Sequence, residues 1–491
     1  MNRTFTARSS LTGFVRIILL SVLTVSTGLA QGGSPITLGP PPSLKLPTPQ
    51  HLKLRNGVGV VLMENHKVPL VQIEIMVRGG SAMDPQGKTG LAGMTADMME
   101  EGAGERSSLE FADAIDFLGG SISAYAGMHS SGVNLFTPLS KIDSALPLLA
   151  DMVLRPMFPQ AELERLKNER LTTLIQWHDE PRAIASALFN KTLYGESHPY
   201  GAMSIGTESG IRSFSVEDLR RFHRMTFTPS NATVIVVGDV NPDGVMKLLD
   251  RYFGGWQGEN IDIPEVPTSS QVTSREIYLV DKPGAAQSEI RIGRIGVDRS
   301  TPDYYATIVM NTILGGSFSS RLNQNLRERN GYTYGAGSRF MYRLSRGPFL
   351  ASAAVQTDVT DKALTEFFNE LKGIREPVSD DELTRARNYV ALDYPNSFET
   401  ISQTAGELAD LVMYGLPDDY FNTYVGNILG VAKDQVLATA KKYIDPDNIA
   451  IIVVGDRAKI EAGITALGLG TIHNLTINDV LGPAPTMEGG R

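Results

Sequence analysis

The chain carries an internal repeat with a period of about 220 residues, and this repeat constrains its fold more than any other feature. Segments of the first half return in the same order in the second half at nearly constant spacing. The pairs are 68–80 with 285–297, 162–176 with 382–396, 193–195 with 413–415, and 226–240 with 442–457. The last pair is the clearest, because each member has a Pro-x-Asn turn, a β-branched strand and a final Gly-Asp.

A period this long does not fit a solenoid, so the repeat predicts two homologous domains. In each half, strands and helices are mixed without strict β–α–β alternation, which predicts an α+β fold with helices on one face of each sheet. The segment 258–276 contains Pro and Ser and is weakly periodic, as expected of a linker. The predicted layout is a Pro-rich strap at 31–50, domains at 51–257 and 277–475, and a tail at 476–491.

The first thirty residues have the pattern of a secretory signal. Arg3, Arg8 and Arg16 precede the apolar run 17–29, and small residues end at Ala30, where we expect cleavage. An uncleaved membrane anchor is the alternative, but the run is short for a membrane span. Residue 31 is Gln, so a lipid-modified N-terminal cysteine is excluded. Without a later span, the sequence predicts an exported protein with no stable membrane segment, most simply in a bacterial periplasm.

Charge and composition exclude several functions. The formal net charge is −9 and becomes −12 after loss of the signal, which holds three arginines and no acid (−9 − 3). An acidic chain without a basic block is a poor ligand for nucleic acid or anionic membranes. The chain has no cysteine, so it has no disulfides, no thiolate chemistry and no cysteine ligands for zinc.

Residues 80–102 carry a motif with fixed spacing. It comprises Gly80, Asp84, Gly90-Leu91-Ala92, Met98 and Gly102. This pattern resembles the pitrilysin, insulinase and mitochondrial processing peptidase family, the inverzincins, whose zinc helix reads His-x-x-Glu-His. Two histidines at i and i+4 share one helix face and hold the metal, and the Glu acts as general base on the bound water. A more distal Glu completes the zinc site in that family.

The resemblance implies that every zinc-site position is vacated in this chain. Gly93 and Asp97 stand at the two His positions, and Ala96 stands at the Glu position. In the family's distal Glu-Arg-x-x-x-x-x-Glu segment, Glu169 and Arg170 are kept, but Gln176 stands at the metal-binding Glu. We therefore expect no metal and no cofactor in this chain.

The remaining carboxylates near this helix leave one alternative open. Asp97, Glu100 and Glu101 lie within one turn and offer the hard oxygens that Ca²⁺ or Mg²⁺ prefers. The simpler interpretation is a solvated helix end, because acidic residues close in sequence are usually exposed and separately hydrated. We expect the solvated helix end.

The second half keeps another signature of the same family. Its pattern Ser-Arg-Leu-x-x-x-Leu-Arg-Glu…Gly-x-x-Tyr places Arg327 and Tyr334 seven residues apart. The resemblance implies that this pair binds the scissile region of an extended peptide, and that Gly315, Gly316 and Ser317 form a glycine-rich loop touching substrate. From residue types alone, Arg327 is equally a helix-end arginine paired with Glu328, and Tyr334 a residue packed in the sheet.

Together these features predict a non-catalytic, peptide-binding subunit of a zinc metallopeptidase. The resemblance implies that two chains close as halves of a clam-shell chamber, and that a partner bearing His-x-x-Glu-His supplies the zinc. A stand-alone peptide-binding or chaperone-like homodimer is the alternative. An active peptidase with a non-standard metal site is a third interpretation, against which the vacated positions argue.

Overall fold

The computed structural model describes residues 44–260 and 262–487. The predicted signal peptide, strap residues 31–43 and the last four residues of the predicted tail lie outside this range. The first described residues contact the second half of the chain, because Asn422 forms hydrogen bonds with the backbone of Leu46 in both directions (2.9 and 3.1 Å). No helix in the described ranges is long and apolar enough to cross a membrane.

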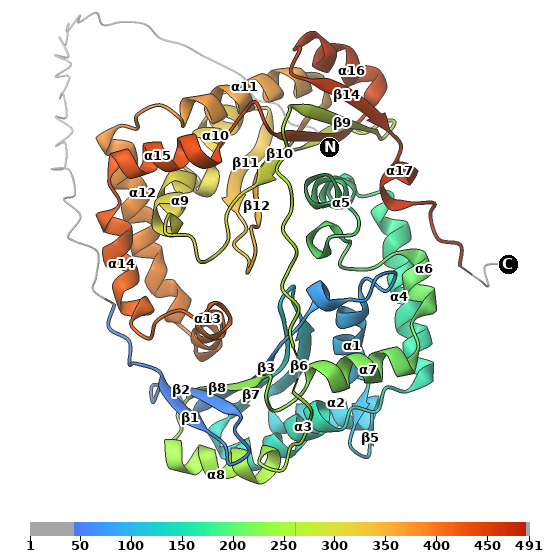
Figure 1. The fold of residues 1–491 in the computed structure, drawn as a ribbon, viewed down its shortest axis with the longest axis vertical. Helices are drawn as coiled ribbons and strands as arrows, with labels where there is room; N and C mark the ends of the chain where they lie inside the picture. The colour runs from blue at the N-terminus through green and yellow to red at the C-terminus, as the bar shows by residue number, and fades with distance from the viewer. Residues whose placement is uncertain (1–43, 261, 488–491) are drawn as a thin grey trace, which may run out of the picture. The chain divides into compact units, whose positions relative to one another are not determined.

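The first half builds a six-stranded sheet in the order β1-β2-β8-β3-β7-β6 (Figure 1). Its strands are β1 (Gln50–Lys53), β2 (Gly59–Glu64), β3 (Leu70–Arg78), β6 (Ser121–Ala126), β7 (Ser130–Pro138) and β8 (Ala232–Gly238). Its helices are α1 (Leu91–Met99), α2 (Ser108–Leu118), α3 (Ile142–Leu154), α4 (Gln160–Trp177), α5 (Pro181–Tyr194), α6 (Glu208–Ser213), α7 (Val216–Thr226) and α8 (Pro242–Phe253). A short ladder pairs β4 (Gly102–Ala103) with β5 (Arg106–Ser107).

The second half builds a second six-stranded sheet in the order β11-β12-β10-β13-β9-β14. Its strands are β9 (Glu276–Asp281), β10 (Gln287–Ile295), β11 (Thr333–Phe340), β12 (Pro348–Gln356), β13 (Ala450–Gly455) and β14 (Thr471–Leu475). Its helices are α9 (Tyr304–Asn311), α10 (Arg321–Asn323), α11 (Thr360–Gly373), α12 (Asp380–Asp393), α13 (Ile401–Tyr414), α14 (Tyr420–Gly430), α15 (Lys433–Tyr443), α16 (Arg457–Ala466) and α17 (Ile477–Leu481).

The two sheets match strand for strand when one order is reversed, which confirms two homologous sheet-and-helix halves. The antiparallel pairs β3–β7 and β10–β12 hold corresponding places, as do the parallel pairs β2–β8 and β9–β13. Only one edge differs. Strand β1 pairs antiparallel with β2, whereas β14 pairs parallel with β9 and comes from the end of the chain.

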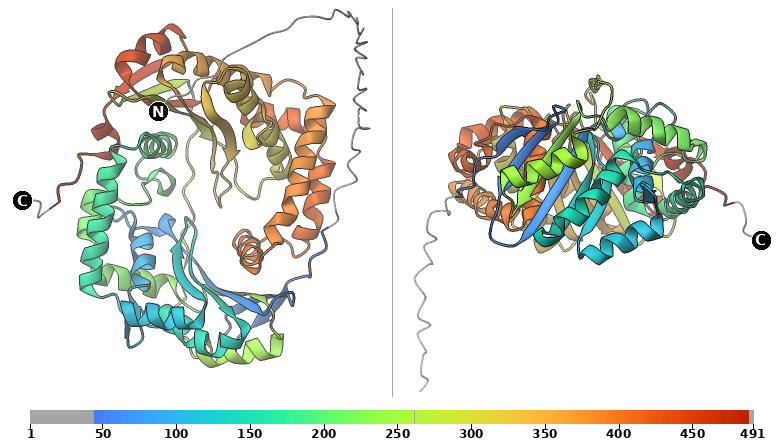
Figure 2. Two further views of the ribbon diagram at one scale, coloured as in Figure 1. Left: turned by 180° about the vertical axis from the view of Figure 1, so that it is seen from behind. Right: turned by 90° about the horizontal axis from the view of Figure 1, so that it is seen from below.

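Each sheet is covered on one face by helices of its own half. In the first half, Ile73 and Ile75 of β3 and Val234 of β8 are buried in a core that includes α3 and α8. The right-hand view of Figure 2 looks onto helices that cross this face. Successive side chains of a strand point to opposite faces, so the neighbouring buried residues of β8, Val234 and Ile235, enter different cores.

The opposite faces are covered by helices exchanged between the halves, which the sequence-based expectation of helices on one face did not include. Helix α5, from the first half, packs on β10 and β13, where Ile184 and Phe189 share a core with Ile452. Helix α13, from the second half, packs on β3 and β8 (Figure 1). The two helices are repeats of each other, because Tyr194 and Tyr414 end them 220 residues apart (414 − 194).

Candidate functional site

Helix α1, which aligns with the family's zinc helix, is held at its entry by Asp84. The Asp84 carboxylate accepts hydrogen bonds from the backbone N–H groups of Gly90 (2.7 Å) and Ala92 (2.8 Å), which lack partners within the helix. Burial raises the pKa of Asp84 to about 6 against the opposing effect of these bonds. Gly90 precedes the helix at φ = 90°, a left-handed conformation that favours glycine. The Asp…Gly-Leu-Ala part of the motif therefore has a structural role.

An arginine contacts the positions where the family's histidines would stand. Arg170 on α4 donates to the Asp97 carboxylate (2.6 Å) and to the Gly90 carbonyl oxygen (2.7 Å). It lies so near Gly93 that a Cβ there would be 3.1 Å from the guanidinium. The Arg170 side chain is only 14% exposed, whereas Asp97 is half exposed. The helix is thus joined to α4 by an ion pair that occupies both former His positions.

The other two vacated positions do not combine with Asp97 into a ligand set. Ala96 is buried at 5% exposure, and Gln176 is exposed near the end of α4. Among the described residues, no group of three His, Cys, Asp or Glu side chains has a metal-binding arrangement. The chemistry of these residues does not fit the catalytic zinc of the resembling family, which needs three protein ligands.

The three acids at the C-terminal end of α1 each have a different partner. Asp97 pairs with Arg170, and the Glu100 carboxylate accepts from the backbone N–H of Ala124 on edge strand β6 (2.7 Å). Glu101 accepts from the Ser108 hydroxyl (2.8 Å) and pairs with Arg165. The neighbouring carboxylates and above all burial raise the pKa of Glu100. These residues tie α1 to α4 and β6 and leave no shared site for a cation.

Arg327 and Tyr334 lie on exposed segments of the second half. Arg327 follows α10 in the π-helical turn η5 (Gln324–Arg329), where its guanidinium lies 4.8 Å from the Phe318 ring centroid. It also pairs with Glu328 at 3.2 Å, and both side chains are about 40% exposed. The pairing with Glu328 considered from residue types alone is therefore present. Phe318 was missed, although it stands next to the glycine-rich segment as an apolar residue in a polar context.

Tyr334 is 91% exposed, so the interpretation that it packs in the sheet was wrong. It lies in β11, the edge strand of the second sheet, where the pairing with β12 is interrupted between Thr333 and Ala336. The Thr333 hydroxyl fixes this bulge by donating to the Ala354 carbonyl oxygen (2.7 Å) and accepting from the Gly335 N–H (3.1 Å). Bulges of this kind re-aim side chains at sheet edges.

The predicted glycine-rich loop is closely packed against β11. Gly315 and Gly316 end the π-helical turn η4 (Thr312–Gly316). A Cβ at Gly315 would lie 2.2 Å from the backbone nitrogen of Ser338, and one at Gly316 would lie 2.8 Å from the Asn311 side chain. The Ser317 hydroxyl donates to the Thr312 carbonyl oxygen (3.2 Å). Close backbone approach thus accounts for both glycines, and their contact with substrate stays a prediction.

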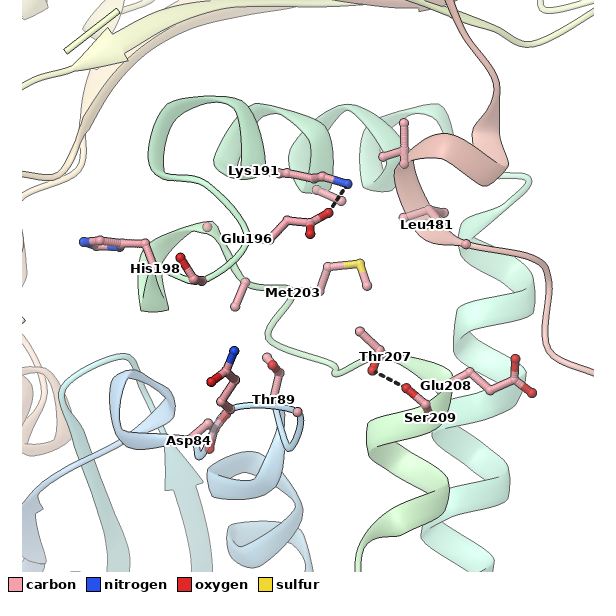
Figure 3. A pocket seen from close by; sticks show the side chains of 18 of the residues that line it. Asp84, Thr89, Lys191, Glu196, His198, Met203, Thr207, Glu208, Ser209 and Leu481 are labelled. Carbon is pink, nitrogen blue, oxygen red and sulfur yellow. Dashed lines mark hydrogen bonds and ion pairs between the residues drawn. The ribbon is translucent and has the colours of Figure 1, made fainter. Parts of the chain in front are cut away.

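A pocket of about 930 Å³ lies beside the entry of α1 (Figure 3). Its walls include Asp84, the end of α5, the start of α6 and the segment around Leu481. Figure 3 shows Lys191 paired with Glu196 and Thr207 hydrogen-bonded to Ser209 among the lining residues. Lys191 and Glu196 pair with each other, and the Asp84 carboxylate is engaged by backbone N–H groups, so these three groups do not select a ligand.

Comparisons with known proteins agree with this geometry. Residues 59–201 match the model of "Insulinase (Peptidase family M16)", and residues 213–390 match that of "Peptidase M16 inactive domain". The chain belongs to peptidase family M16. A "Non-peptidase homolog YmxG" from Helicobacter pylori is 23% identical over 82% of this chain and 93% of its own length. An "Uncharacterized zinc protease YmxG" from Bacillus subtilis is 28% identical over 57% of this chain and 67% of its own.

Solved M16 structures share the fold. A peptidase M16 inactive domain protein from Pseudomonas fluorescens superposes with a TM-score of 0.78 at 24% identity, over 83% of this chain and 97% of its own. A protease from Helicobacter pylori gives a TM-score of 0.76 at 22% identity, over 83% and 100%. With the vacated zinc positions, these findings identify an M16 homologue of the inactive, non-peptidase kind.

Proposed function

We propose that this chain is the non-catalytic, substrate-binding subunit of a periplasmic zinc metallopeptidase heterodimer. Its partner would be a homologous chain with an intact His-x-x-Glu-His helix, which would hold the zinc ion. The observation that supports this role most is a contrast within the chain. Arg170 contacts the former His positions, whereas Arg327 and Tyr334 stay exposed, and Tyr334 lies on the edge strand β11.

The exposed segments suit an extended peptide. An edge strand such as β11 has backbone groups that a peptide strand pairs with, and flanking side chains then set orientation. Arg327 offers a planar fork of N–H donors for a carbonyl or a developing oxyanion, and the Tyr334 hydroxyl is a further donor. Releasing Arg327 from Glu328 costs little, because ion pairs between exposed groups contribute about 0–1 kcal/mol.

Purification of the tagged chain from its native periplasm tests the proposal. We expect a stoichiometric partner with an intact zinc motif, and peptidase activity only in the complex. Recovery of the chain by itself, at micromolar concentration and with peptide affinity but no hydrolysis, would instead support the stand-alone peptide-binding homodimer. Absence of the chain from the periplasmic fraction would contradict the predicted export.

A further inference from the structure

A second cavity, of about 330 Å³, lies among the helices of the second half. Its walls come from Arg299 in the segment before α9, from Tyr304 at the start of α9, from Tyr394 after α12, from Glu407 and Asp410 on α13, and from Tyr424 on α14. Neither Arg327 nor Tyr334 is among the lining residues, and the η4 turn contributes Thr312 and Gly316 to the wall. The volume falls at the lower end of the range for small-molecule sites.

Tyrosine rings form much of the wall. The Tyr394 ring stacks on Tyr424 with centroids 4.0 Å apart, and Tyr420 lies at 5.8 Å from Tyr424. Tyr394 is only 8% exposed, and its hydroxyl has no hydrogen-bond partner among the described residues. A buried polar group without a partner costs about 1–3 kcal/mol, so a ligand group that bonds this hydroxyl would offset a cost already present.

Opposite charges line the same cavity without pairing. The Arg299 guanidinium lies 3.6 Å from the Tyr304 ring centroid and 5.1 Å from that of Tyr420. In the described part of the chain, no ion pair within 4.0 Å joins Arg299 to Glu407, to Asp410 or to another carboxylate. Glu407 is half-buried and Asp410 is exposed, and partial desolvation raises the pKa of both acids, an effect that Arg299 opposes. The cavity therefore holds one cation without an ion pair beside two such carboxylates, and the third lining acid, Asp393, accepts a hydrogen bond from Asn396 (3.0 Å).

We propose that this cavity binds a small zwitterion, a free α-amino acid or a dipeptide, with its ammonium group at Glu407 and Asp410 and its carboxylate at Arg299. A simple amine would leave Arg299 unpaired and would be repelled by it. A simple carboxylic acid would be repelled by the two acids. Only a ligand with both charges pairs all three groups, and the tyrosine rings then accept its apolar part. The site does not depend on the proposed subunit role.

Thermal-shift and calorimetric measurements on the mature chain test the proposal. The common α-amino acids and the dipeptide Leu-Gly are screened first, followed by a matched set of L-leucine, isoamylamine and 4-methylpentanoate. The last two lack the carboxylate and the amine, respectively. We expect at least one zwitterion to raise the melting temperature at millimolar concentration, and each single-charge analogue of it to bind at least tenfold more weakly. Comparison of Leu-Gly with the free amino acids distinguishes the two sources. No response to any zwitterion, or equal binding of the amine alone, overturns the proposal.

Variants assign each charge to its partner. Glu407→Gln should weaken binding of the zwitterion at least tenfold and remove the preference for it over its deaminated analogue. Arg299→Met should instead remove the preference over the decarboxylated analogue. The loss of a different preference in each variant indicates pairwise contacts, because partial unfolding would weaken the binding of all ligands alike. Glu399→Gln, an exposed acid just before α13, is the matched control and should change nothing. Unchanged binding in folded Glu407→Gln would also overturn the proposal.

Discussion

The surroundings of α1 and the Arg327–Tyr334 segment show what each half of the repeat has kept. Around α1, Asp84, Asp97, Glu100 and Glu101 all have partners on neighbouring elements, and Arg170 is largely buried. In the second half, the Arg327 side chain contacts the exposed Glu328 carboxylate and the Phe318 ring, and Tyr334 is almost fully exposed.

This difference separates two ways of losing catalysis. The region around α1 lacks the metal ligands, and its remaining polar groups form contacts that stabilise the fold. The other has kept polar groups at the surface, where they stabilise the chain little and are available to a ligand. Mutations in the first region should therefore change stability, and mutations in the second should change activity in a complex.

The largest effect is expected from Arg327→Ala. If Arg327 stabilises a developing oxyanion across the interface, its loss should lower kcat of the reconstituted peptidase by about 10²–10³-fold, as for one oxyanion donor. The control is Arg329→Ala, which removes the same charge from an exposed side chain two residues further along the chain. Equal rates for the two variants in the complex would show that Arg327 is not used in this way.

The second effect concerns the pH dependence of stability through Asp84. Its folded pKa of about 6 lies above the ordinary value of 3.8, so between these values the folded state binds more protons than the unfolded state. The stability that Asp84 contributes is full below about pH 4 and is lost as the pH rises through 6. The change amounts to at most about 3 kcal/mol. Asp84→Asn should flatten this part of the curve of unfolding free energy against pH.

Asp116→Asn, an exposed carboxyl on α2, is the charge-matched control for Asp84. Its denaturation curves should follow those of the wild type at every pH. A slope between pH 4 and pH 6 that survives in Asp84→Asn would assign the pH dependence to other groups. Substitution of Arg327 or Tyr334, the exposed site residues of the second half, should leave this slope unchanged.

The sequence predicted the repeat, the sheets and the vacated zinc positions for identifiable physical reasons. Runs such as 232–238 and 450–455 are β-branched and end at glycine, so they form buried central strands in both halves. The zinc positions could be assigned only through the resemblance of residues 80–102 to the family motif, in which metal coordination fixes the His-x-x-Glu-His spacing on a helix. Once the motif is aligned, Gly93, Ala96 and Asp97 show that the ligands are absent.

Two features could not be predicted from the sequence. An apolar stripe shows that α5 or α13 is packed, but not on which sheet, so the exchange of the two helices needed the structure. The contact of the Arg170 side chain with α1 could not be predicted either. Gly93 leaves room for the guanidinium and Asp97 offers it a carboxylate, but neither residue identifies Arg170 as the partner. The same limit applies to Tyr334, whose exposure depends on a bulge set by Thr333.

A smaller effect is expected when the ion pair at α1 is broken. Asp97→Ala leaves the Arg170 guanidinium largely buried, and the Gly90 carbonyl oxygen is then its one hydrogen-bond acceptor among the described residues. We therefore expect a loss of about 1–2 kcal/mol in unfolding free energy. Glu328→Ala removes the exposed counterpart in the second half and should cost less than about 0.5 kcal/mol. Urea denaturation of both variants measures the difference. Similar costs for the two would remove the distinction between the two regions.

The smallest effect, and the one that discriminates best among the functional hypotheses, is that of metal removal. Treatment of the isolated mature chain with a chelator should leave its melting temperature unchanged, and elemental analysis should find far less than one zinc per chain. The reason is chemical: Gly93 and Ala96 offer no ligand atoms, and Asp97 is engaged by Arg170. A zinc content near one per chain that disappears in Asp97→Ala would instead establish a non-standard metal site. In that case Arg170 would have to release Asp97, and the region around α1 would have a functional role in addition to its structural one.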